Sequence, residues 1–205
     1  MKLQRVVLLG AGGHAKSCID VIEQTGVFEI VGLLAKTEEI GLTVSGYEVI
    51  GSDSDLRLIK KEVNYAINCI GGIRTQKLRQ KITENAKLVG FEFPSVVSPH
   101  AVVSKNSYIG EGTIVFNGAI INSGAYIAEG CIINTSALLE HDVRIERFSH
   151  ISTRATVNGN VSIGASTFLG SGSVIKEGVN IGDDCLIGMG TIVRKDLSNG
   201  TKYVG

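Results

Sequence analysis

Sixteen consecutive six-residue units run without interruption from Ala101 to Asp196, and the third residue of every unit is aliphatic. The first residue of each unit is small: Ala, Ser, Thr, Val or Cys. A helix repeats near 3.6 residues and a strand every two, so neither accounts for this period. A period of six is typical of a parallel β-helix, in which each unit is a short strand plus a turn and three units close one coil. The third residues of the units are Val103, Ile109, Val115, Ile121, Ile127, Ile133, Leu139, Ile145, Ile151, Val157, Ile163, Leu169, Ile175, Ile181, Ile187 and Val193.

The regularity of the repeat favours the left-handed form of the β-helix. Right-handed β-helices and sandwiches of short strands need irregular spacing, whereas no residue is inserted anywhere in the repeat region. The left-handed form is an exception to the right-handed crossover rule. Because the first part of the chain lacks the period, the sequence predicts two domains, residues 1–94 and 95–205. The 26 glycines suit a fold made of tight turns.

The N-terminal part reads as a small α/β unit, in which strands and helices alternate. Such alternation predicts a parallel sheet of about four strands, or half a Rossmann fold, with a ligand at the carboxyl ends of the strands. The predicted strands are residues 5–9, 29–34, 64–70 and 87–93, and the predicted helices are residues 16–24, 53–61 and 74–86.

The loop after the first predicted strand carries Gly10, Gly12 and Ala15 in the spacing of the dinucleotide fingerprint. Glycines there let backbone amides close on a pyrophosphate at a helix N-terminus. The second strand is followed by Ala35 and Lys36, with no carboxylate to take a ribose hydroxyl. We therefore interpret the loop as a holder for a nucleotide diphosphate, not for a redox cofactor. A tight turn without a ligand is the alternative.

Charge, hydropathy and cysteine spacing exclude several classes. The formal net charge is zero and no basic run occurs, which gives no support for a nucleic-acid surface or an anionic membrane patch. No apolar stretch approaches the ~18 residues of a membrane span. The four cysteines show no metal-binding spacing. Cys131 and Cys185 would lie three coils and ~14 Å apart, so we expect no disulfide between them and infer a reducing cytoplasm.

Histidines are few, and one has a notable context. His14 lies in the glycine loop and His100 precedes the repeats, while His141 and His150 take outward positions in their units. An outward histidine on a solenoid is often only a solvated surface residue. His141, however, is flanked by Glu140 and Asp142, and a carboxylate on one ring nitrogen makes the other a better general base.

The coil length predicts a further neighbour of His141. Gly159 would stand one coil above it, with a backbone amide near the same corner and no side chain in the way. Such an amide is able to stabilise a developing oxyanion.

The segment from Cys131 to Ser152 resembles the catalytic coil of the hexapeptide acyltransferases that acetylate nucleotide-linked amino sugars. The nearest families are the UDP-4-amino-sugar N-acetyltransferases of the bacillosamine type and the sialic acid O-acetyltransferases (NeuD-like). The likeness covers nearly the whole chain. Its motifs are the Gly-x-Gly-Gly-His loop, the Gly71-Gly72-Ile73-Arg74 segment, Asn134-Thr135, Glu140-His141, Phe148-Ser149-His150 and Val204-Gly205.

This resemblance implies a cytoplasmic homotrimer, without a metal, that holds acetyl-CoA in the groove between neighbouring β-helices. It implies that His141 is the base, that Asp142 orients it where the N-acetyltransferases carry Glu, and that the Gly159 amide forms the oxyanion hole. The residues implied to contact CoA are Asn134, His150, Gly170 and Gly188. The residues implied to hold the nucleotide-sugar are Gly10, Gly12, Gly13, His14, Gly71, Gly72 and Arg74.

Two departures from the family pattern bear on the substrate. Members with a UDP-sugar site carry aspartates where this chain has Ala35-Lys36, and they continue past Val204-Gly205 with a tail that helps to cover CoA. Acetylation of a nonulosonate hydroxyl and a non-catalytic nucleotide-sugar-binding scaffold are the alternative functions. A zinc enzyme of the carbonic anhydrase type would need three convergent histidines, which the spacing of His100, His141 and His150 does not favour.

Overall fold

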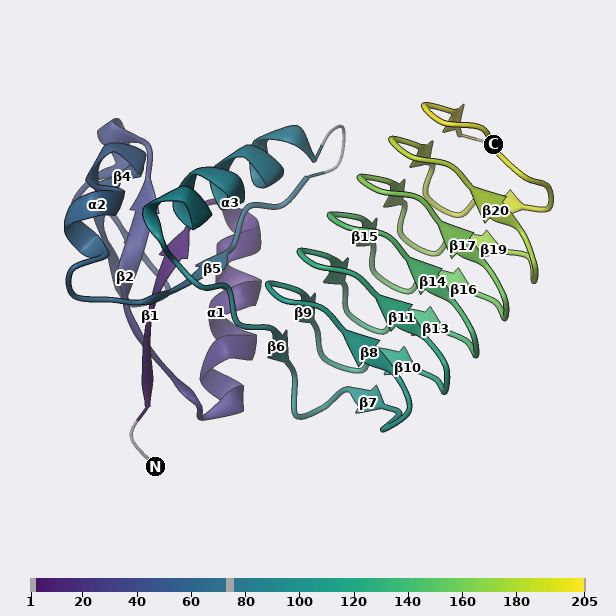
Figure 1. The fold of residues 1–205 in the computed structure, drawn as a ribbon, viewed down its shortest axis with the longest axis horizontal. Coiled ribbons are helices and arrows are strands. Elements are labelled where there is room, and N and C mark those ends of the chain that lie inside the picture. The colour runs from purple at the N-terminus through teal and green to yellow at the C-terminus, as the bar shows by residue number, and fades with distance from the viewer. Residues whose placement is uncertain (1–2, 73–75, 205) are drawn as a thin grey trace. The chain divides into compact units, whose positions relative to one another are not determined.

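The computed structural model describes residues 3–72 and 76–204 (Figure 1). The chain forms two compact units. One consists of residues 1–71 and 78–96, and the other of residues 72–77 and 97–205.

The first unit is built on a five-stranded sheet with the order β3-β4-β2-β1-β5. Strand β1 pairs in parallel with β2 on one side and with β5 on the other, and β4 extends the sheet in parallel beyond β2. Only β3 runs antiparallel, as the outer arm of a hairpin with β4. The strands are β1 (Gln4–Leu9), β2 (Phe28–Ala35), β3 (Thr43–Val44), β4 (Tyr47–Ser52) and β5 (Tyr65–Asn68).

The helices of this unit follow the parallel strands. They bury Ala15, Cys18, Ile19, Ile22 and Ile82 in the core with the apolar residues of β1 and β2, at spacings of three and four residues. The α-helices are α1 (Gly13–Thr25), α2 (Leu56–Ile59) and α3 (Lys77–Val89), and two short 3₁₀ helices are η1 (Thr37–Glu39) and η2 (Asp53–Asp55).

Three details of the predicted α/β unit are wrong. Residues 87–93 form no strand, because α3 continues to Val89 and leaves only a single bridge between Glu92 and Tyr65. The buried residues Ile82, Thr83 and Ala86 keep the helical spacing, and Leu88 is exposed. The helix predicted over 53–61 is divided into η2 and α2, and the hairpin β3-β4 was not predicted.

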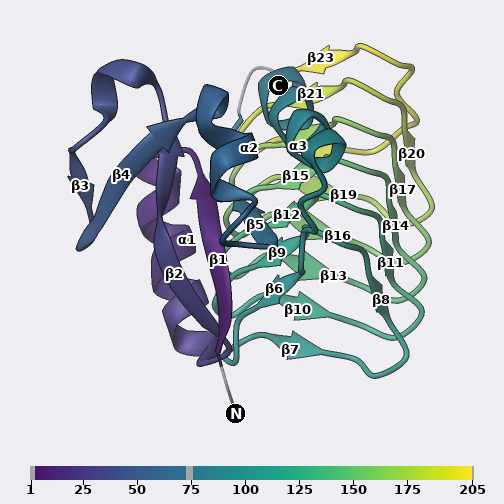
Figure 2. The same ribbon diagram turned by 60° about the vertical axis from the view of Figure 1, so that its left-hand side comes forward.

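The second unit is a left-handed parallel β-helix. Sixteen two-residue strands, β7 to β22, occupy the predicted six-residue units, one in each, and β6 and β23 extend the stack at its two ends. Every strand pairs in parallel with the strand one coil away, as Ile121 does with Leu139. The period and the coil of three units are thus confirmed. Figure 2 shows the strands as stacked rows around the solenoid.

We name the three sheets of the solenoid by their first strands. The β7 sheet contains β7 (Val102–Val103), β10 (Ile120–Ile121), β13 (Leu138–Leu139), β16 (Thr156–Val157), β19 (Val174–Ile175) and β22 (Ile192–Val193). The β8 sheet contains β8 (Tyr108–Ile109), β11 (Tyr126–Ile127), β14 (Arg144–Ile145), β17 (Ser162–Ile163) and β20 (Asn180–Ile181). The β6 sheet contains β6 (Val96–Val97), β9 (Ile114–Val115), β12 (Ile132–Ile133), β15 (His150–Ile151), β18 (Phe168–Leu169), β21 (Leu186–Ile187) and β23 (Lys202–Tyr203).

The second strand residue points inward and the first points outward. Inward residues such as Ile127, Leu139 and Ile145 are fully buried and form one continuous core along the solenoid. The small first residues of the units close the corners, and the turns repeatedly place a residue in the left-handed region. All four cysteines are buried, and none of them forms a disulfide. Across residues 3–72 and 76–204, no helix has the length and hydropathy needed to span a membrane.

Candidate active site

His141 and Asp142 form a hydrogen-bonded pair in the turn between β13 and β14. Nδ1 of His141 lies 2.9 Å from Oδ2 of Asp142, and the two side chains are 59% and 61% exposed. A carboxylate only accepts hydrogen bonds, so Nδ1 carries the proton and Nε2 of the neutral ring is left with a free lone pair. In the neutral form of the imidazole, the pair therefore directs Nε2 as a hydrogen-bond acceptor, as a general base requires.

The imidazole of His141 lies against the backbone of Gly159, one coil further on. A Cβ atom on Gly159 would be 2.6 Å from both Nε2 and Cε1 of His141, so only glycine leaves room for the ring there. The carbonyl of His141 accepts a hydrogen bond from the amide of Asn160 at 3.1 Å. Among the described residues, the amide of Gly159 has no hydrogen-bond acceptor. This amide is thus available beside the histidine.

Glu140, the other carboxylate that flanks His141 in the sequence, pairs with a residue of the neighbouring coil. Its Oε2 accepts a hydrogen bond from Nδ2 of Asn122 at 2.9 Å, one coil earlier. Asp142 is therefore the carboxylate that orients the imidazole, and Glu140 is held by the neighbouring coil.

Asn134 and His150 form a second pair, at a different place on the solenoid. Nδ2 of Asn134 lies 3.2 Å from Nε2 of His150, and Nδ1 of His150 lies 3.1 Å from the carbonyl oxygen of Gly72. Since the amide donates and the carbonyl accepts, His150 carries its proton on Nδ1. The His150 side chain points outward from the solenoid but is only 5% exposed, with its ring at 5.1 Å edge-on to Phe168. It is therefore fixed by contacts instead of being a solvated surface residue.

Gly170 and Gly188 follow Asn134 at the same corner, between the β6 and β7 sheets. A Cβ on Gly170 would meet backbone atoms of Gly188 and Met189, and a Cβ on Gly188 would meet Val204. Both glycines thus permit close approach of successive coils.

The predicted acetyl-transfer residues occupy two corners of one protomer. The first corner, which follows the β7 sheet, carries His141, Asp142 and Gly159. The second corner, which precedes that sheet, carries Asn134, Gly170 and Gly188, with His150 beside it. The members of the first set lie on adjacent coils, whereas Gly170 is two coils beyond Asn134 at the second corner. Within a single chain the two sets lie at opposite ends of the β7-sheet strands.

The glycine loop of the first unit lies at the carboxyl end of β1. Gly12 precedes helix α1 without a side-chain cap, and the first turn has no acidic residue. A Cβ on Gly12 or Gly13 would meet nothing within 4 Å, so this helix N-terminus is open. Gly10 has another reason to be glycine, because its φ is 105° and a Cβ would press on Ile70. The backbone amides at Gly12 and Gly13 are thus accessible to an anion.

Gly71 lies next to this loop. A Cβ on Gly71 would be 3.1 Å from Cβ of His14. Since β1 lies between β2 and β5, the loop after β1 and the end of β5 border the point where the strand order reverses, where open α/β sheets bind ligands. The structure thus brings Gly10, Gly12, Gly13, His14 and Gly71 to one edge of the sheet. Gly72 belongs to the second unit, and Arg74 lies outside the described residues.

Sequence reasoning missed a pair of buried thiols beneath the glycine loop. A hydrogen bond from Cys69 lowers the pKa of Cys18, with further contributions from His14 and the charge of Arg79, although burial opposes the shift. Burial raises the pKa of Cys69. Cys18 lies on α1 and Cys69 directly after β5, so only the packing of helix on sheet brings them together.

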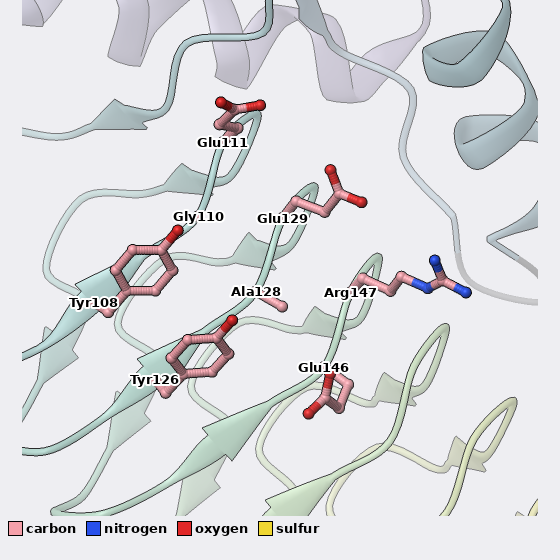
Figure 3. Close-up of a pocket in the computed structure, with 8 residues that line it drawn as sticks. All are labelled: Tyr108, Gly110, Glu111, Tyr126, Ala128, Glu129, Glu146 and Arg147. Carbon is pink, nitrogen blue, oxygen red and sulfur yellow. The ribbon is translucent and has the colours of Figure 1, made fainter. Parts of the chain in front are cut away.

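A separate pocket of about 370 Å³ opens along the β8 sheet (Figure 3). The Tyr108 and Tyr126 rings stack at 5.0 Å, and the Arg144 guanidinium lies over Tyr126 at 4.6 Å. The pocket contains neither His141 nor His150. Its lining residues are Tyr108, Gly110, Glu111, Tyr126, Ala128, Glu129, Glu146 and Arg147. The pocket is therefore separate from the residues predicted to carry out acetyl transfer.

Among the described residues, no group of three or more His, Cys, Asp and Glu is placed to hold a metal.

Both units match known families. Residues 5–86 match the PglD N-terminal domain, and residues 160–195 match the hexapeptide repeat of succinyl-transferase. A GDP-perosamine N-acetyltransferase of Escherichia coli O157:H7 is 29% identical over 114 residues, which are 53% of this chain and 49% of that protein. The match thus spans about half the length of this curated relative.

Two solved structures are similar over the whole chain. Perosamine N-acetyltransferase from Caulobacter crescentus, a histidine variant in complex with CoA and GDP-perosamine, is 32% identical with a TM-score of 0.93, and the match covers 100% of this chain and 95% of that one. The acetyltransferase domain of PglB from Neisseria gonorrhoeae FA1090, in complex with acetyl coenzyme A, is 30% identical with a TM-score of 0.92, covering 100% and 97%. The chain therefore belongs to the acetyl-CoA-dependent sugar N-acetyltransferases that join a PglD-type N-terminal domain to a hexapeptide-repeat β-helix.

Proposed function

We propose that this protein transfers the acetyl group of acetyl-CoA to the amine of a nucleotide-linked amino sugar. The observation that carries the proposal is the exposed His141–Asp142 pair beside the unengaged amide of Gly159. A base, the residue that orients it and an oxyanion donor within one corner are the elements that direct acyl transfer needs.

The reaction proceeds in a complex of both substrates. Nε2 of His141 takes a proton from the amine as the nitrogen attacks the thioester carbonyl. The Gly159 amide donates a hydrogen bond to the oxyanion that forms on the carbonyl oxygen. When the tetrahedral intermediate collapses, the carbon–sulfur bond breaks, the CoA thiolate takes up a proton from the imidazolium, and the N-acetyl sugar is released.

The nucleotide is held at the glycine loop in this proposal. The open helix N-terminus at Gly12 and Gly13 supplies amides and partial positive charge for a diphosphate. Strand β2 ends at Ala35 and is followed by Lys36, which lacks the carboxylate of the UDP-sugar pattern. GDP-perosamine is named for two of the similar proteins. We therefore place a GDP-linked 4-amino sugar ahead of its UDP counterpart as the substrate.

A homotrimer is the proposed assembly, and the outward side chains of the β7 sheet support it. Val102, Ile120 and Ile192 are 65%, 39% and 45% exposed, and Leu138 and Val174 belong to the same apolar row, which only Thr156 of β16 interrupts. The corresponding row of the β8 sheet is polar beyond its first two tyrosines, with Arg144, Ser162 and Asn180. A long exposed apolar row is expected to pack against another chain.

Threefold packing through the β7 sheet would also complete the site. In a closed cyclic assembly each copy presents one edge of this sheet to the opposite edge of the next copy. The His141 corner of one copy would then border the Asn134 and His150 corner of its neighbour. CoA in the groove between two copies would contact Asn134, His150, Gly170 and Gly188 from one side and reach His141 on the other.

The test is a thiol-release assay with acetyl-CoA and a panel of acceptors. The panel contains GDP-, UDP- and CMP-linked 4-amino sugars, free sialic acid, and the hydroxyl counterparts of each. Turnover on a nucleotide-linked amine supports the proposal, and the preferred nucleotide follows from the ratio of kcat/KM values. Turnover confined to a hydroxyl acceptor would assign O-acetylation instead. Binding of the nucleotide-sugar without thiol release would indicate a non-catalytic nucleotide-sugar-binding scaffold.

A further inference from the structure

The carboxylate of Asp142 lies in the space that a side chain on Gly124 would fill. Gly124 is at the same corner as Asp142, one coil earlier, and both residues have positive φ, 77° and 58°. A Cβ on Gly124 would overlap Oδ1 of Asp142 and would lie 3.3 Å from its Cγ and 3.4 Å from its amide nitrogen. The absence of a side chain at residue 124 therefore determines where this carboxylate lies.

The same carboxylate is the one that orients His141. While Oδ1 faces Gly124, Oδ2 is 2.9 Å from Nδ1 of the imidazole. Because the Asp142 side chain is more than half exposed, packing elsewhere does little to fix its rotamer. The imidazole is limited on its other side by Gly159. The pair thus lies between a glycine of the preceding coil and a glycine of the following coil.

The turn itself does not require glycine at residue 124. Asn160 follows Asp142 at the same corner, one coil later, also with positive φ (57°), so two residues with side chains are able to stack there. At Gly178, one coil beyond, an added Cβ would meet nothing within 4 Å. Gly124 thus differs from Gly178, because it provides both the backbone conformation and the space for the carboxylate.

The coil that carries His141 repeats this arrangement at all three corners. Ser136, Asp142 and Phe148 all have positive φ, and each has a glycine eighteen residues earlier whose Cβ would press on its side chain. Those glycines are Gly118, Gly124 and Gly130. A glycine in the preceding coil is thus the way in which this coil directs its corner side chains.

We propose that Gly124 is a positioning residue for acetyl transfer, acting through Asp142 on the orientation of His141. The inference rests on the proposed function, in which His141 is the base. A methyl group at residue 124 displaces the carboxylate from its position, and the imidazole then loses the hydrogen bond that fixes its tautomer and direction. Substrate binding is not involved, so the effect is confined to turnover.

The experiment compares Gly124→Ala with Gly200→Ala in the intact protein. Gly200 has a φ of 72° and open space around its Cβ position, at a different corner near the end of the solenoid, so both substitutions impose a similar backbone cost. We expect similar decreases in Tm for the two variants. We expect kcat to fall about tenfold or more for Gly124→Ala alone, with the KM values for acetyl-CoA and sugar unchanged.

A double-mutant cycle separates positioning from general destabilisation. In an Asp142→Ala background, Gly124→Ala should cause no further loss of kcat, because the carboxylate that it displaces is gone. An equal loss in both backgrounds would overturn the proposal, as would a Gly124→Ala variant with the kcat of Gly200→Ala. If Gly124→Ala fails to fold, Gly124→Asn with Gly200→Asn replaces the pair, since Asn accepts positive φ more readily.

The same data distinguish failure of the inference from failure of the proposed function. If His141→Ala leaves kcat unchanged, His141 is not the base and both proposals fall. If His141→Ala and Asp142→Ala lower kcat but Gly124→Ala behaves as Gly200→Ala does, only the role of Gly124 is refuted.

Discussion

His141 and Asp142 are adjacent in the chain, yet their side chains meet at 2.9 Å between Nδ1 and Oδ2. Neighbouring residues of an extended strand point to opposite faces and do not meet in this way. The contact occurs in a turn where Asp142 has a φ of 58°, a conformation that aspartate accepts more readily than most residues. The dipeptide thus makes a base and its orienting group without help from a distant segment.

Replacing His141 tests the base directly. We expect His141→Ala to lower kcat by at least about a hundredfold, because general base catalysis contributes ~10²–10⁴-fold. The oligomeric state and Tm should stay unchanged, since the side chain is 59% exposed. The measurement is thiol release with the preferred acceptor, and His100→Ala, an exposed histidine before the repeats, is the control. A variant with near-original kcat would remove His141 from the base role.

Replacing Asp142 tests the orientation of the base. Asp142→Ala should reduce kcat by about tenfold to a hundredfold, less than loss of His141, because the imidazole remains but is no longer held. Asp184→Ala is a matched control, since Asp184 is an exposed aspartate that also has positive φ, at 54°. Equal kcat values for the two variants would show that Asp142 only serves the turn.

Replacing Gly13 in the glycine loop should weaken binding of the nucleotide-sugar without destabilising the protein. Gly13 begins α1, and a Cβ there meets nothing within 4 Å, so Gly13→Ala should fold normally. The methyl group obstructs the approach of a diphosphate to the helix N-terminus. Because a hydrogen bond to a charged group contributes ~1.5–3 kcal/mol, KM for the nucleotide-sugar should rise about tenfold or more. KM for acetyl-CoA serves as the internal control, and Ser17→Ala, on the exposed side of the same helix, as the control variant.

The apolar row of the β7 sheet predicts which substitution disrupts the proposed trimer. Ile120→Glu places a charge within this row, on the strand next to β7, so we expect smaller particles in light scattering and a loss of activity. Asn180→Glu makes the same addition at the outward position of β20 and should leave the assembly intact. A trimer that persists with Ile120→Glu would mean that the chains associate through another surface.

The buried thiol pair predicts a pH-dependent stability of the first unit. The pKa of Cys18 falls from its ordinary 9.0 to about 6, so the folded protein releases this proton at a lower pH than the unfolded chain. The free energy of unfolding should therefore increase as the pH rises from about 6 to about 9. This contribution is lost as the pH falls through the pKa that Cys18 has in the folded protein. The raised pKa of Cys69 acts in the opposite direction only above its own ordinary value.

Urea denaturation across that range tests the thiol pair. Cys69→Ala removes the hydrogen bond that lowers the pKa of Cys18, so the rise in stability should flatten. Cys185→Ala, which removes a buried thiol from the solenoid, should retain the rise. An unchanged pH profile in Cys69→Ala would show that Cys18 does not titrate in this range.

The solenoid could be predicted almost completely, because its period is visible residue by residue. An inward aliphatic residue such as Ile127 or Leu139 at the third place of every six-residue unit indicates how the strands and coils are arranged. The α/β unit was less predictable at its edges. The sequence does not predict strand β4, and it predicts a strand over residues 87–93 although the burial of Ile82 and Ala86 continues a helix to Val89.

The site was predictable where it depends on the coil length and not where it depends on side-chain direction. The eighteen-residue step places Gly159 beside His141, and the same step would have found Asn122 beneath Glu140. Which carboxylate turns toward the imidazole is decided by local rotamers and neighbouring coils. The meeting of Cys18 and Cys69 depends on helix packing, for which the sequence offers no period.

The eighteen-residue coil makes position in the chain equivalent to position in space, since Ile120 and Leu138 are paired neighbours. A six-residue insertion between Asp142 and Gly159 would keep every strand in the repeat pattern but carry Gly159 to another corner of the triangle. An eighteen-residue insertion would return Gly159 to its corner, one strand spacing of ~4.8 Å too far along the axis. Insertions of whole six-residue units between Asp142 and Gly159 are therefore expected to abolish catalysis even where they keep the repeat pattern, because they separate Gly159 from His141. Substitutions keep these two residues side by side.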